Sequence, residues 1–195
     1  MKCFLINLIV FVIVVNSDTG KRLSLPQLPF GKYRLNFLAI TRCDIVQTNN
    51  KIKYELYLSK KSANTTEIKG NVTNYVPFDD TLDLEFNLAV KDSIGGWKEN
   101  AFVYKTPKAC SSLKKFLGRA WTPVMASSGT YNATCPFAVG YYPVVGADTS
   151  VFMDSNFPKS FFYGTYKFRV IYSKKNEVYN CFTLIVEIKR PWETD

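Results

Sequence analysis

The sequence is poor in the side chains that enzymes use for proton transfer and nucleophilic attack. It contains no histidine, which is the commonest general base. Ser127 and Ser128 precede Gly129 but lack the first glycine of a G-x-S-x-G nucleophile elbow, so they indicate a turn. Asp79 and Asp80 are adjacent, and in an extended chain their carboxylates point apart instead of forming a facing acid–base pair. We therefore expect no catalytic residue and no enzymatic activity.

The cysteines favour disulfide bonds over a metal site. There are five, without any C-x-x-C spacing and without a histidine to join them at zinc. Cys3 lies in the N-terminal apolar run, which leaves Cys43, Cys110, Cys135 and Cys181. An even number in an exported chain is typical of disulfides, and four cysteines allow three pairings. With no glycine-rich phosphate loop in view either, we expect neither a metal nor a cofactor.

The N-terminus has the layout of a secretory signal peptide. Met1 and Lys2 precede an apolar run from Cys3 to Val15, which is shorter than the roughly 20 residues that span a membrane. We assign residues 1–17 to this signal, with cleavage between positions 17 and 20, and expect a secreted, extracellular protein. The rest of the chain is long enough for one domain with its own core.

Three N-x-[ST] sequons and the net charge describe the surface. The sequons begin at Asn64, Asn71 and Asn132, and in an exported chain they predict solvent-facing N-glycosylation. The formal net charge is +9, but the lysines occur as scattered pairs and form no basic run of the kind that binds nucleic acid. We interpret the charge as solvated strand edges and turns, with weak attraction to anionic membrane surfaces as the alternative.

Alternation of apolar and polar residues with a period of two dominates the chain and predicts half-buried β-strands. The clear cases are residues 52–58, 82–90, 166–172 and 182–188, and the weaker ones are 32–40, 66–76, 97–105 and 136–145. Only residues 111–118 have a helical pattern, and residues 119–134 are expected to form a long loop. This pattern predicts an all-β, two-sheet antiparallel sandwich with one short helix.

Aromatic residues are numerous for a sandwich, with 15 Phe and 12 Tyr. Several are expected in loops, where a simple core cannot use them. Such residues typically mark a ligand mouth or a membrane contact, although they could also plug the end of the sandwich. The candidates for this rim are Ile94, Trp97, Phe157, Phe161 and Phe162.

An ordered set of motifs resembles a known family. The run Lys69 to Thr73, the alternating strand 82–90, the KDSIGGW stretch from Lys91 to Trp97 and the cysteine before the helix come first. They are followed by CPFAVGY from Cys135, by Phe157-Pro158, by GTYKF from Gly164 and by the last cysteine. Over residues 43–190 the chain resembles the ganglioside activator proteins of the ML lipid-recognition superfamily. It is most similar to their divergent insect secreted branch, which includes the chemosensory CheB proteins.

The resemblance implies an immunoglobulin-like β-cup with an apolar cavity between its sheets. It pairs Cys43 with Cys181 and Cys110 with Cys135, puts Asn71 on a glycosylated position and places Trp97 on a membrane-contacting loop. Residues 18–42 have no counterpart and form an N-terminal segment that could contain a first strand. The family's further cysteines in the stretch matching 98–134 are absent here, so the loops at the rim should differ. The side chains expected to line the cavity are Leu56, Ile68, Val72, Leu84, Phe86, Leu88, Phe168, Val170, Leu184 and Val186.

The expected function is binding and carriage of a lipid or another apolar small molecule, in keeping with a role in chemosensory, pheromone-type perception. The alternative is an extracellular recognition module that presents its surface to a protein receptor. Sheets that close fully would turn the expected cavity residues into ordinary core, and the alternation alone does not separate these two cases.

Overall fold

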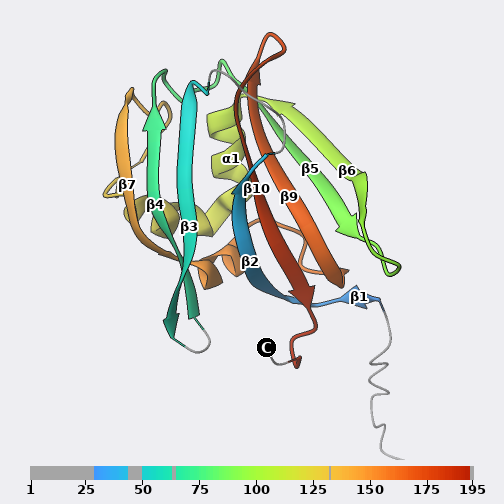
Figure 1. The fold of residues 1–195 in the computed structure, drawn as a ribbon. Helices are drawn as coiled ribbons and strands as arrows, with labels where there is room; N and C mark the ends of the chain where they lie inside the picture. The colour runs from blue at the N-terminus through green and yellow to red at the C-terminus, as the bar shows by residue number, and fades with distance from the viewer. Residues whose placement is uncertain (1–28, 44–49, 63–64, 132, 194–195) are drawn as a thin grey trace, which may run out of the picture.

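A computed structural model describes residues 29–43, 50–62, 65–131 and 133–193. These residues form two antiparallel sheets that face one another, with short helices between them along one side (Figure 1). The predicted all-β sandwich is confirmed. The proposed signal peptide 1–17, the start of the N-terminal segment and the sequon residues Asn64 and Asn132 lie outside the described residues.

The larger sheet has five strands in the order β2-β10-β9-β5-β6. Its inward face is apolar because alternate residues of β5, including Leu84, Phe86 and Leu88, are buried. The bounds of the strands are β2 Arg34–Arg42, β5 Asp83–Lys91, β6 Trp97–Pro107, β9 Gly164–Lys174 and β10 Glu177–Lys189.

Strand β2, in front of Cys43, belongs to this sheet. Strand β2 runs antiparallel to β10 from Arg34 to Arg42, which agrees with the strand predicted at 32–40. A two-residue strand β1, Phe30–Gly31, pairs with β8, Phe161–Phe162, in a separate two-stranded sheet. The folded unit therefore extends in front of residue 43, where the sequence analysis began the domain, because β10 needs β2 as its second neighbour.

The smaller sheet has three strands in the order β3-β4-β7. The bounds are β3 Ile52–Ser62, β4 Thr65–Asn74 and β7 Gly140–Asp148. Strand β7 begins four residues later than the predicted 136–145, because residues 136–139 run beside the chain at Phe78, which exchanges backbone hydrogen bonds with Phe137.

Gly70 is the position in β4 where no other residue fits. Its φ is +130°, and an added Cβ would lie 1.9 Å from the backbone oxygen of Glu55 on β3. We expect Gly70→Ala to lower the free energy of unfolding by about 2–4 kcal/mol, measured by urea denaturation. Gly95→Ala is the control, since Gly95 also has a positive φ of +99° but open space around it. Equal losses in the two variants would contradict the clash.

The helical region is longer than predicted. Helix α1, Ala109–Leu117, matches the predicted helix, and the chain then continues through a 3₁₀ turn, Gly118–Ala120, into α2, Trp121–Ala126. The predicted loop over 119–134 is therefore wrong in its first half. Trp121 anchors α2 because its ring is buried and its Nε1 donates to the Ala133 carbonyl at 3.1 Å. A second 3₁₀ helix, Thr149–Asp154, follows β7.

Both predicted disulfides are present. Cys43 is bonded to Cys181, which ties the end of β2 to β10, and Cys110 is bonded to Cys135, which ties α1 to the segment before β7. Within the described residues, no helix is long and apolar enough to cross a membrane.

Candidate ligand-binding cavity

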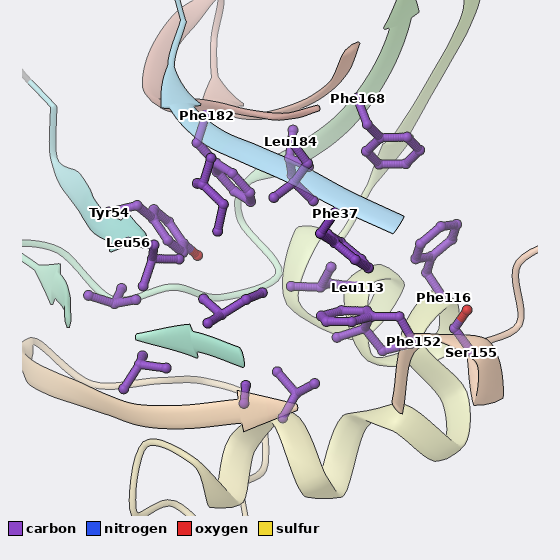
Figure 2. Close-up of a pocket in the computed structure, with 18 of the residues that line it drawn as sticks. Phe37, Tyr54, Leu56, Leu113, Phe116, Phe152, Ser155, Phe168, Phe182 and Leu184 are labelled. Atoms are coloured by element: carbon purple, nitrogen blue, oxygen red, sulfur yellow. The ribbon is translucent and has the colours of Figure 1, made fainter. Parts of the chain in front are cut away.

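A cavity of about 260 Å³ lies between the two sheets. Figure 2 shows side chains from both sheets and from the helices pointing into it, among them Leu56 from the smaller sheet, Phe168 and Leu184 from the larger one, and Phe116 from α1. Among the residues that the structure describes, none that lines it carries a charge. A space of this kind favours apolar molecules, since moving a charge into it would cost solvation without a compensating partner.

Nine of the ten side chains predicted to line the cavity do so. Side chains such as Leu56 and Leu184 point inward but are not fully buried, because they face the cavity instead of packing against other side chains. The nine are Leu56, Ile68, Val72, Phe86, Leu88, Phe168, Val170, Leu184 and Val186.

Leu84 is the exception. It lies on the same face of β5 as Phe86 and is fully buried, but it does not line the cavity. It belongs to a solid core with Tyr172, Ala109 and Cys110, each at most 1% exposed. This end of the sandwich is closed because the start of α1 packs on β5, with the Ala109 amide donating to the Leu82 carbonyl at 2.8 Å.

One wall of the cavity comes from parts of the chain that the sequence analysis did not assign to it. Helices α1 and α2 contribute Leu113, Phe116 and Met125. Phe37 on β2 packs on Phe152, with ring centroids 5.4 Å apart, and both point into the cavity (Figure 2). The helical pattern of 111–118 was the available signal for Phe116, but nothing local showed where the helix would dock.

The predicted rim residues do not form one exposed cluster. Ile94 is 95% exposed at the tip between β5 and β6, and Phe162 is 55% exposed. Trp97 is half-buried at the start of β6, with Lys167 Nζ 4.6 Å from its ring centroid. Phe157 lines the cavity, and the ring of Phe161 packs against that of Phe157, with centroids 5.2 Å apart. The hairpin between β5 and β6 and the strand β1, which pairs with β8, do lie at the same end of the larger sheet (Figure 1).

Asn71, the sequon residue that the structure describes, lies on the outer face of the smaller sheet. Its neighbours across the two adjacent strands are Glu55 and Pro143, and both are exposed. The side chain therefore points away from the cavity.

Asp80 holds the first turn of α1, the helix that carries Phe116. Its two carboxylate oxygens accept from the Ser111 amide at 2.8 Å and from the Ser111 hydroxyl at 2.6 Å. Both hydrogen bonds lower the pKa of the Asp80 carboxyl, and the one from the hydroxyl group has the larger effect. Because this pKa is lower in the folded protein than in the unfolded chain, the ionised carboxylate stabilises the fold above the unfolded-state pKa of about 3.9. The stabilisation is lost as the pH falls through the folded-state pKa.

We expect Asp80→Ala to lower the free energy of unfolding by about 0.5–1 kcal/mol at pH 7, as removal of a helix cap does. The charge itself adds little because Asp80 is exposed to solvent. In urea unfolding at pH 7 and at pH 2.5, the difference from the unaltered protein should shrink at the lower pH. A difference that stays constant would mean that the ionised carboxylate does not cap α1.

In the part of the chain that the structure describes, no three His, Cys, Asp or Glu side chains gather in a way that could hold a metal ion. A scan against models of known protein families finds no match to this chain, and a search of curated proteins finds none either.

Proposed function

We propose that this protein is a secreted carrier of a lipid or another apolar small molecule, with no enzymatic activity. The observation that carries the proposal is the uncharged cavity between the two sheets, lined by aromatic and aliphatic side chains such as Phe86, Phe168 and Leu184. The motif resemblance to the ML superfamily points the same way, and through its insect branch it favours a chemosensory ligand.

The size of the cavity supports a single chain-like ligand. Its volume of about 260 Å³ lies just below the roughly 300–1,000 Å³ of typical small-molecule pockets. Each buried methylene contributes about 0.8 kcal/mol, so one alkyl chain could bind usefully without any charged contact. Binding of this kind asks for no catalytic group, and we assign none.

Export from the cell is part of the same proposal. The signal-peptide layout of residues 1–17 supports it, and two disulfides fit an oxidising compartment. The outward position of Asn71 fits N-glycosylation there.

A titration with the apolar fluorophore N-phenyl-1-naphthylamine tests the proposal. The folded protein should enhance its fluorescence saturably, with one equivalent bound, because the walls of the cavity are mostly apolar. Absence of saturable binding by the folded, disulfide-bonded protein would overturn the proposal.

Strand β6 favours receptor recognition as a second candidate function. It is the outer strand of the larger sheet and is exposed on both faces, with Phe102, Val103 and Tyr104 at 57%, 50% and 49% exposure. Apolar side chains on an edge strand are a common docking surface. If this function holds instead, Phe102→Ser with Tyr104→Ser should abolish a receptor complex that forms without ligand, while Phe168→Ala should leave it intact.

A further inference from the structure

Few polar side chains lie on the wall of the cavity, and most of them already form hydrogen bonds within the protein. Their donors already reach backbone carbonyl groups, so they are not free to recognise a ligand. These pairs are Ser127 to Val124 at 2.6 Å, Ser128 to Met125 at 2.8 Å, Tyr142 to Ala138 at 2.9 Å and Tyr166 to Phe162 at 3.1 Å.

Asn74, at the end of β4, is different. It lines the cavity and is only 4% exposed, and its Nδ2 donates to the Ala138 carbonyl at 3.4 Å. That carbonyl can only accept, so it sets which way the amide is turned. The other amide atom, Oδ1, is buried and has no hydrogen-bond partner in the protein. A buried acceptor without a partner is costly, and a ligand donor that reached it from the cavity would stabilise it.

Two tyrosines stand beside it. Tyr54 is opposite Val72 and Asn74 is opposite Ile52, so Tyr54 and Asn74 are diagonal neighbours on the inward face of the smaller sheet. The ring of Tyr54 lies 6.2 Å from that of Tyr172 across the sandwich. The two phenols carry two O–H protons, and at most one of these can be used in a hydrogen bond between them, so at least one O–H group is left to donate elsewhere. Figure 2 shows the Tyr54 hydroxyl turned into the space between the sheets.

Burial also keeps both phenols in the donating form. Desolvation raises the pKa of Tyr54 to about 12 and that of Tyr172 well above its ordinary value. The wall of the cavity therefore includes one acceptor without a partner, the Asn74 carbonyl oxygen, and an O–H donor from the two tyrosines, among side chains that are mostly apolar.

We propose that the cavity selects an aliphatic alcohol and binds it in one direction, with the hydroxyl group at Asn74 and Tyr54 and the alkyl chain along the apolar walls. A hydroxyl group donates and accepts at once, which matches an acceptor on Asn74 together with a donor from the two tyrosines. An ether or an alkane cannot donate to Asn74. A carboxylate cannot donate either, and no cationic residue in the described part of the chain lines the cavity to balance its charge. This inference rests on the proposed function, since it names the ligand class of the same site.

Displacement of N-phenyl-1-naphthylamine by 1-decanol and by its methyl ether tests the proposal. The unaltered protein should bind the alcohol about tenfold more tightly than the ether, the usual size of a lost buried hydrogen bond. Asn74→Leu removes the acceptor at similar volume, so it should bring the ratio close to one while binding of the ether stays unchanged. Tyr54→Phe removes a hydroxyl group and keeps the ring, and it should reduce the same ratio several-fold.

The outcomes separate this inference from the function beneath it. Binding of the fluorophore without a preference for the alcohol would overturn the choice of ligand class and leave the carrier function standing. An alcohol preference that survives in Asn74→Leu would also overturn it. If Asn74→Leu fails to fold, because it loses the hydrogen bond to Ala138, Tyr54→Phe decides by the same ratio. No binding of the fluorophore at all would overturn both proposals.

Discussion

Replacement of Leu184 by Trp is expected to weaken the binding of N-phenyl-1-naphthylamine by about tenfold or more, a loss of at least about 1.4 kcal/mol. Leu184 lies in the middle of β10 and points into the cavity between the sheets (Figure 2). An indole at this position would fill space that a ligand needs. The protein should still fold, since the added ring enters existing space and does not have to displace packed neighbours.

Ile185→Trp is the matched control. Ile185 is the next residue along β10, and because side chains alternate along a strand it faces outward, opposite Lys167 on β9. The same indole there should leave fluorophore affinity unchanged. The titration compares the dissociation constants of the two variants at equal folded concentration, which circular dichroism checks. Equal affinities would show that the fluorophore binds outside the cavity.

Removal of the disulfides is expected to have the largest effect on stability. The bond between Cys43 and Cys181 closes a sequence separation of 138 residues, and that between Cys110 and Cys135 closes one of 25. In the chain-entropy account, a longer closed loop restricts the unfolded chain more. We expect replacement of the first pair by alanine to cost about 5 kcal/mol and that of the second about 3.5 kcal/mol.

Urea unfolding of the two double-alanine variants measures these losses. Each is a large part of the roughly 5–15 kcal/mol that stabilises an ordinary domain, so either variant should be marginal at 37 °C. Addition of dithiothreitol should destabilise the unaltered protein and leave a variant that lacks both pairs unchanged. A larger loss from the Cys110–Cys135 pair would contradict the ranking and would show that packing around the buried Cys110 outweighs loop closure.

The strands were predictable because their signal is local. Alternation places Phe86 and Leu88 on one face of β5 and their polar neighbours on the other, and a strand needs only that pattern to be recognised. Most of the cavity lining followed from the same rule. The pairing of the four cysteines did not follow from spacing and came from the motif resemblance, and the structure has that pairing.

The sequence could not show which inward-facing residues of a strand border the cavity and which are packed in the solid core. Leu84 and Phe86 share a face of β5, yet Leu84 is packed solid beneath the start of α1 while Phe86 borders the cavity. That difference depends on where the helix docks, which is set by contacts distant in sequence. Phe157 was placed at the rim for the same reason, although its ring lies 5.8 Å from that of Phe116 inside the cavity.

The central claim is that the space between the sheets holds an apolar ligand, and native mass spectrometry of protein secreted by eukaryotic cells tests it most directly. The spectrum should show the protein with one bound apolar molecule, which organic extraction releases and identifies. The Leu184→Trp variant from the same cells should show much less of that complex. A bare protein mass for the unaltered protein, with no lipid or other apolar molecule in the extract, would contradict the claim.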